Sequence, residues 1–370
     1  MTTPSLVRRE WPLVLTLASF ALFLRFGEAW AADLSRPAWF AFIFLWLIGV
    51  ILLSVFAVVR HAEGLAGLLG EPLGTLVLTL SVTGIEVMII AASMATPHGS
   101  PTLARDAMFA VVMIVLNGMV GLSLLLGGLR WHEQSYNLQG ANAFLAMILP
   151  LAVLGLILPR FTETSPGPTF SPVQAGFLSF MSIGLYCVFL AVQNVIHRRY
   201  FVAVDDKGAQ RPAAPARART HSLAYHAALL VAYLLPMVLL SKQLAVPIDH
   251  GISVLGAPAA LGGFLVAALV LSPESVSAVR AALANQLQRS VNLLLGSVLA
   301  TIGLTIPGVL TIGLLTKKNI VLGLEVQDIV LLSLTLVLST LTFSSRRTNV
   351  LLGAVHLLLF FAYLLLIFQR

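Results

Sequence analysis

Residues 70–95, with the sequence GEPLGTLVLTLSVTGIEVMIIAASMA, decide the fold class. A bilayer core about 30 Å thick requires about 20 apolar helical residues per crossing, so this stretch is long enough to span it. Segments of the same kind recur from Trp11 to Phe368. Of the 370 residues, 58% are hydrophobic and 10% are charged, and the mean hydropathy is +0.96. Because a soluble domain carries about 25% charged residues, the sequence predicts an all-α polytopic membrane protein.

The hydropathy pattern predicts about eleven transmembrane helices and no separate soluble domain. These spans must be helical, since no polar backbone group can face lipid unpaired. The predicted spans are residues 11–31, 37–59, 70–95, 103–128, 140–160, 171–196, 222–241, 255–279, 289–315, 325–343 and 349–369. Lys and Arg gather in alternate loops, which places the N-terminus in the cytoplasm and the C-terminus in the periplasm. The pI of about 10.0 therefore reflects membrane orientation and not nucleic-acid binding.

A polar segment, residues 198–221, divides the chain and predicts a flexible cytoplasmic linker. It leaves a first transmembrane helix in residues 1–36, one group of five spans in residues 37–197 and another in residues 222–370. Five is an odd number, so the two groups have opposite orientations in the membrane. The sequence therefore predicts an N-terminal helix followed by two inverted five-helix repeats.

A spacing shared by the two groups supports the repeat. Leu73-Gly74 precedes Glu86 by the same interval as Leu261-Gly262 precedes Glu274, because Gly74 and Gly262 each lie 12 residues before the glutamate. Apolar residues fill most of both intervals. The spacing predicts that the two glutamates occupy equivalent positions.

Glu86 and Glu274 are the candidate exchange residues. An ionised carboxylate within the bilayer costs several kcal/mol unless a cation or hydrogen-bond donors face it. Gly84 and Pro273 predict local breaks in the two helices, which would expose carbonyl oxygens beside the carboxylates. Burial favours the protonated carboxyl and a bound cation favours the ionised one, so one group can hold either in turn. The alternative is a glutamate that only joins helices through hydrogen bonds.

Further candidates are polar side chains within or beside these spans. Sodium, potassium and calcium ions prefer oxygen ligands, and the predicted neutral ligands are Thr83, Ser272, Asn117 and Ser297. The predicted ion pathway contains Arg105, Asp106, Arg289 and Asn292. The alternatives are a surface ion pair for Arg105 and Asp106, a cytoplasmic marker for Arg289 and close helix packing for Ser297. His356 is expected to be a hydrogen-bonded structural residue and not a proton relay.

The sequence contains no motif for ATP binding, serine hydrolysis or zinc catalysis, so no enzyme is predicted. The single cysteine, Cys187, excludes an intrachain disulfide and is expected to be a packing residue. Two other classes stay open. A cation channel would conduct without moving protons, and an intramembrane enzyme or lipid-handling protein would need a nucleophile that the sequence does not reveal.

Several motifs, in the same order along the chain, resemble the calcium/cation-proton exchanger family. They are Leu69–Leu76, Pro101–Asp106, Gly121–Gly128, Leu271–Glu274, Leu287–Thr301 and Arg347–Leu351. The resemblance extends from about Arg60 to the end of the chain. It implies an eleven-span protein of the bacterial inner membrane that exchanges cytoplasmic sodium, potassium or calcium for external protons. It implies no cofactor and leaves homo-oligomerisation open.

The sequence also departs from the wider family. Calcium exchangers carry a Gly-Asn pair before each acidic residue, and this chain has Val82-Thr83 and Val270-Leu271 there. Since calcium requires six to eight oxygen ligands, the loss of both Asn side chains favours monovalent cations. The linker keeps only Asp205 and Asp206 of the acidic linker typical of relatives, which argues against its regulation by cations.

Overall fold

The computed structural model describes residues 10–32, 34–70, 73–94, 100–165, 167–202, 222–254, 256–316 and 319–369. Most of the predicted linker, residues 203–221, lies outside this part of the chain. The α-helices are α2 (Trp11–Ala31), α3 (Pro37–Leu69), α4 (Leu73–Met94), α5 (Leu103–Val112), α6 (Val120–Trp131), α7 (Leu138–Ala152), α8 (Pro172–Ala191), α9 (Leu223–Ser253), α10 (Ala260–Leu283), α11 (Leu287–Ala300), α12 (Ile306–Thr316), α13 (Val326–Thr342) and α14 (Val350–Phe368). Short π-helices are η1 (Met113–Met119), η2 (Val153–Ile157), η4 (Val192–Ile196) and η6 (Thr301–Thr305), and 3₁₀ turns are η3 (Leu158–Arg160) and η5 (Arg198–Phe201).

The helices confirm the predicted all-α polytopic fold. Within the described residues, 9 helical segments are long and apolar enough to cross a membrane, and two shorter apolar segments, Thr79–Ala92 and Val326–Thr342, occupy the other two predicted spans. The main error concerns α3 and α9, which extend well past the predicted ends at residues 59 and 241. The prediction places Arg60 in a loop, whereas α3 continues through it to Leu69, and the Arg60 side chain contacts the buried Glu10 carboxylate.

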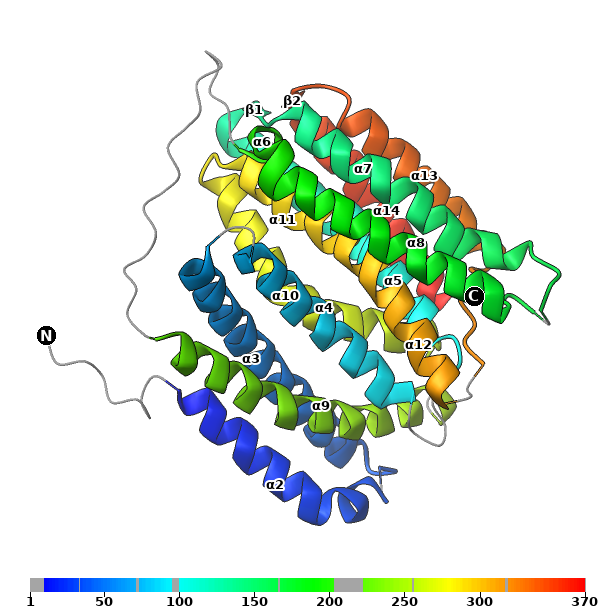
Figure 1. Ribbon diagram of the computed structural model, residues 1–370. Coiled ribbons are helices and arrows are strands. Elements are labelled where there is room, and N and C mark those ends of the chain that lie inside the picture. Colours follow the sequence, from blue (N-terminus) through cyan, green and yellow to red (C-terminus); the bar gives the residue numbers. More distant parts are fainter. Residues whose placement is uncertain are drawn as a thin grey trace, which may run out of the picture. The chain divides into compact units, whose positions relative to one another are not determined.

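The chain divides into two compact units, which are described separately. Unit 1 comprises Met1–Ser100 and Ala216–Gly262, and unit 2 comprises Pro101–Pro215 and Gly263–Arg370. In unit 1, helix α9 packs against α2, α3 and α4 (Figure 1). At one end of unit 1, the Trp39 Nε1–H donates to the Trp30 carbonyl at 3.1 Å. The start of α2, the second half of α3 and the start of α9 meet at the other end through polar side chains.

The connections between the helices of unit 2 lie at its two ends. At one end, strand β1 (Gln134–Ser135) pairs antiparallel with β2 (Arg347–Thr348) (Figure 1). Near this end, Trp131 Nε1 donates a hydrogen bond to the Leu283 carbonyl. At the other end, the Val321 amide donates to the Pro101 carbonyl and the Gly323 amide to that of Pro168. The loops therefore fall into the two groups that an up-and-down membrane topology requires.

The predicted breaks at Gly84 and Pro273 are wrong, because α4 and α10 are continuous α-helices. Pro273 has no N–H to donate to the Leu269 carbonyl, and the Ser272 hydroxyl donates to that oxygen instead, at 2.7 Å. The helix therefore passes the proline without an unpaired carbonyl. Departures from α-helical geometry occur instead in the π-helices, which are frequent at functional sites.

Candidate functional site

Glu86 lies inside α4 of unit 1, and only 3% of its surface is exposed. Its neighbours Val82, Ile85 and Ile89 are buried and apolar. Thr83, also buried, precedes Glu86 by three residues, a spacing that places both side chains on the same face of the helix. The helix thus presents a carboxylate and a hydroxyl side by side in apolar surroundings.

Glu274 lies in α10 of unit 2 and is half-buried, directly after the buried Pro273. Ser272 commits its hydroxyl proton to the Leu269 carbonyl. Positions two residues apart on a helix do not share a face, so Ser272 and Glu274 point in different directions. The structure therefore gives Ser272 a role in completing the helix around Pro273.

Asn117 lies near the level of Glu274 along unit 2. A Cβ atom on Gly263, at the start of α10, would lie 2.6 Å from the Ala107 nitrogen in α5, and the end of α10 bonds to Trp131 at the end of α6. The two helical segments therefore run side by side in the same direction. Glu274 follows Gly263 by 11 residues and Asn117 follows Asp106 by 11, which puts them within about one helical turn of the same height.

The Asn117 side chain belongs to a fully buried hydrogen-bond network. Its Nδ2 donates to Thr335 Oγ1 at 2.8 Å, and its Oδ1 lies 3.2 Å from His356 Nδ1. Because an amide oxygen can only accept, His356 Nδ1 carries a proton in this arrangement. Thr342 Oγ1 lies 2.9 Å from the other ring nitrogen. His356 is hydrogen-bonded as predicted, and its ring is the one described donor to the Asn117 oxygen.

The π-helices add a second shared spacing. η1 begins at Met113 and η6 at Thr301, each 27 residues after a glutamate. Asn117 and Thr305 likewise follow Glu86 and Glu274 by 31 residues. Thr305 is fully buried, and its hydroxyl has no hydrogen-bond partner among the described residues. Thr305 is not among the residues predicted from the sequence, although extending the repeat spacing past the glutamates finds it.

Arg105 and Asp106 form a buried ion pair and not a surface pair. Arg105 Nε donates to Asp106 Oδ1 at 2.8 Å, and Thr102 Oγ1 donates to Oδ2 at 2.9 Å. Arg105 also reaches the Gly323 carbonyl at 3.4 Å and the Glu325 carboxylate at 3.5 Å. The pair therefore fastens the start of α5 to the segment before α13.

The other predicted pathway residues take different places. Asn292 donates to the Phe201 carbonyl at 2.7 Å and accepts from Gln288, so it holds the end of η5 against α11. Arg289 is exposed and forms no ion pair with a described carboxylate. Ser297 is half-buried in α11. The pathway role of Asn292 and Arg289 and the ligand role of Ser297 stay predictions.

No cluster of three or more His, Cys, Asp or Glu side chains able to hold a metal ion occurs in the part of the chain that the structure describes. Each glutamate segment instead combines one carboxylate with neutral oxygen donors. Such a set suits a weakly and reversibly bound hard cation.

Comparisons with known proteins assign the family. The sequence model of the "Sodium/calcium exchanger protein" family matches residues 39–195 and 225–369. The chain belongs to this family. The two regions that the family model matches coincide closely with the two predicted groups of five spans.

One family relative is the "Sodium-potassium/proton antiporter ChaA" of Escherichia coli, which is 42% identical over 359 residues, covering 95% of this chain and 94% of that protein. The solved structure of native YfkE has a TM-score of 0.73 at 17% identity and covers 97% of this chain and 100% of its own. That of the H+/Ca2+ exchanger CAX has a TM-score of 0.64 at 14% identity, covering 97% and 88%. The two structures confirm the exchanger fold.

Proposed function

We propose that the protein is a secondary active antiporter that exchanges cytoplasmic sodium, potassium or both for external protons. The observation that carries this proposal is the burial of Glu86 in an apolar helix of the membrane domain. A carboxylate in such surroundings is stable when it holds a proton or faces a cation. The 42% identity to a sodium-potassium/proton antiporter supports the same assignment.

Glu86 and Glu274 are the proposed exchange carboxylates, one in each unit. When the carrier faces the cytoplasm, they release protons and take a cation, and external protons displace the cation when it faces outward. Thr83 would support Glu86 and Asn117 would support Glu274 with neutral oxygens, and Thr305, at the position equivalent to Asn117, would supply a further one. The equal intervals from each glutamate to its π-helix favour an inverted repeat, in which the two sites are related by symmetry.

Monovalent cations fit the proposed ligands better than calcium does. Calcium requires six to eight oxygen ligands, usually with several carboxylates. The two segments offer one glutamate each and a few neutral oxygens, and Thr83 stands where calcium exchangers have Asn. A site with few oxygen ligands binds a singly charged ion weakly enough to release it again.

The charge distribution supports a cytoplasmic N-terminus and a periplasmic C-terminus. In the described part of unit 2, seven basic residues lie near the β1–β2 end and only Arg105 and Arg160 near the other. The seven are Arg130, Arg198, Arg199, Arg280, Arg289, Arg346 and Arg347. Since cytoplasmic loops carry the excess of Lys and Arg, the β1–β2 end is assigned to the cytoplasm.

Everted membrane vesicles test the proposal, because their cytoplasmic face is accessible. Adding sodium or potassium to energised, acidified vesicles should release protons in the wild type, and Glu86→Gln and Glu274→Gln should abolish the release without lowering protein levels in the membrane. Glu133→Gln is the matched control, since Glu133 is exposed and pairs only with Arg347 among the described residues. Normal exchange in either test variant would refute the site, and cation flux without proton movement would indicate a channel.

A further inference from the structure

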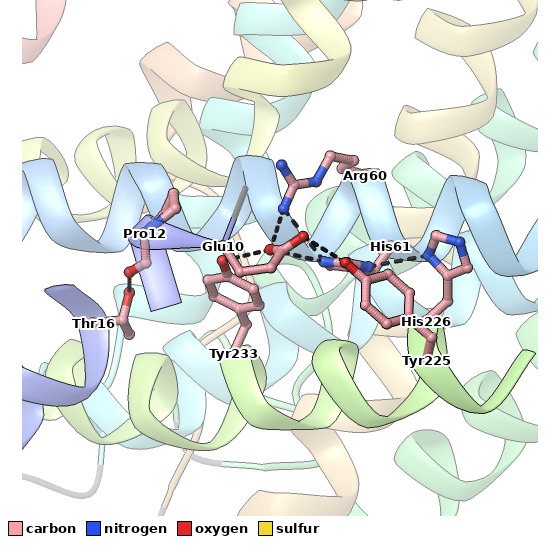
Figure 2. A network of polar contacts seen from close by, with 8 residues as sticks. All are labelled: Glu10, Pro12, Thr16, Arg60, His61, Tyr225, His226 and Tyr233. Atoms are coloured by element: carbon pink, nitrogen blue, oxygen red, sulfur yellow. Dashed lines mark hydrogen bonds and ion pairs between the residues drawn. The ribbon is translucent and has the colours of Figure 1, made fainter. Parts of the chain in front are cut away.

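A second cluster of titratable groups lies in unit 1, around the Glu10 carboxylate at the start of α2 (Figure 2). Glu10 is 3% exposed. Its Oε1 accepts from the Tyr225 hydroxyl at 2.9 Å, and its Oε2 from the Tyr233 hydroxyl at 3.1 Å and from Arg60 Nη2 at 2.5 Å. His61 Nε2 lies 3.4 Å from the same oxygen. The carboxylate thus joins α2 to α3 and α9.

Beside this carboxylate, two imidazoles face each other. His61 on α3 and His226 on α9 bring their Nδ1 atoms to 3.1 Å, a hydrogen-bond distance (Figure 2). Gly64 permits this approach, because a Cβ atom there would lie 2.5 Å from the Nδ1 and Cε1 atoms of His226. The contact therefore depends on a glycine one turn along α3.

An N–H···N bond requires one proton between the two nitrogens. With both rings neutral, one Nδ1 donates and the other accepts. One added proton is also accommodated, because a charged His61 donates through Nδ1 to His226 and through Nε2 toward Glu10. A second added proton places two cationic N–H groups face to face at 3.1 Å, where like charges repel. The pair therefore tolerates one extra proton and is broken by two.

We propose that Glu10, His61 and His226 form a proton-binding site, separate from the exchange carboxylates, that slows exchange when the cytoplasm becomes acidic. The cluster lies at the end of unit 1 that the predicted topology assigns to the cytoplasm. Helices α3 and α9, which it joins, both pack against α4, the helix of Glu86. Binding of the second proton separates the start of α9 from α3 and so loosens the support of the Glu86 helix.

The charged and titratable groups that face the two imidazoles determine how readily these rings bind protons. Arg60 lies 3.4 Å from His61 Nε2 and opposes its protonation, whereas the Glu10 carboxylate favours it. Tyr225 and Tyr233 contact the rings from α9 and are neutral. Glu63 is exposed on α3, two residues after His61. Removing one imidazole removes the second protonation step and leaves the other charges in place.

The inference rests on the proposed antiport, and its test measures the maximal exchange rate against external pH in everted vesicles. Protons that compete at the exchange carboxylates raise the KM for the cation, whereas this site lowers the rate at saturating cation. His226→Gln removes one imidazole, and Gly64→Ala displaces His226 without removing any titratable group. His226→Gln should keep the wild-type rate at alkaline pH and move the acidic midpoint down by about one pH unit. Gly64→Ala should lower the maximal rate at alkaline pH as well, because its methyl group parts the start of α9 from α3 without any added proton.

His250→Gln is the matched control, because His250 lies on the same helix and contacts the Phe40 ring at the other end of unit 1. Its midpoint should equal that of the wild type. Equal midpoints in the wild type, His226→Gln and His250→Gln, a wild-type alkaline rate in Gly64→Ala, or a midpoint that moves with cation concentration would overturn the inference.

Nitrogen NMR of purified protein with ¹⁵N-labelled histidine rings tests the site without any transport. Two coupled titration steps are expected for His61 and His226, and after Gly64→Ala the step at lower pH should move to higher pH, because the two charged rings no longer repel each other. If the wild type titrates in one step, the proton site is absent. If vesicles show no exchange while the two steps are present, the proposed antiport fails and the proton site stands.

Discussion

Replacing Gly353 by alanine should separate two helices of unit 2. Gly353 in α14 lies where that helix crosses α6, and a Cβ atom there would meet the Leu125 nitrogen at 2.5 Å and the Gly121 carbonyl oxygen at 2.8 Å. All of these are backbone atoms, so no side chain can rotate away. Small residues at such crossings allow the close backbone approach that holds membrane helices together.

The size of the effect follows from these distances. Ordinary contact begins at 3.4 Å, so the new methyl group requires the helices to part by 0.9 Å, the difference between 3.4 and 2.5 Å. Overpacking of this kind costs about 1–3 kcal/mol. For a domain of this size, that corresponds to a fall in Tm of about 2–12 °C. Thermal unfolding of the purified protein in detergent measures it.

Gly184→Ala is the matched control for Gly353→Ala. Gly184 is exposed on α8, and nothing lies within 4 Å of a Cβ atom at that position. The same substitution should leave the Tm unchanged or raise it slightly, because alanine favours a helix by up to about 1 kcal/mol over glycine. Equal Tm values for the two variants would refute the close crossing of α6 and α14.

Three further outcomes follow from the structure. Thr305→Val should raise the KM for the cation without lowering the Tm, since it removes a buried hydroxyl that has no described partner, whereas an unchanged KM excludes Thr305 as a ligand. Burial raises the pKa of Glu10, but the Tyr225 hydroxyl and the Arg60 guanidinium more than offset this and lower it. The Tm advantage of the wild type over Glu10→Gln should therefore be full above about pH 4.3 and vanish as the pH falls through the lowered pKa; an advantage independent of pH would contradict this assignment. Arg105→Ala should cost about 3–5 kcal/mol, measured by thermal unfolding, because it leaves the buried Asp106 carboxylate without its cation, and a loss below 1 kcal/mol would show that the pair is not buried.

The sequence by itself determined the membrane class and the positions of the spans. Long apolar stretches have only one stable form in lipid, a helix that satisfies its own backbone, and this requirement is local. The glutamates were also visible from the sequence, because a carboxylate such as Glu86 is conspicuous among apolar residues. The equivalence of Glu274 to Glu86 follows from comparing one half of the sequence with the other.

Only the tertiary structure decided what the polar residues between and beside these stretches do. The ion-path role of Arg105, Asp106 and Asn292 stays a prediction, and the structure adds the partners through which these residues hold loops and helix ends together. The cluster around Glu10 joins residues more than 200 positions apart, and no local pattern announces it. A hydrogen bond depends on where two distant helices meet, and that is fixed by packing and not by the sequence on either side.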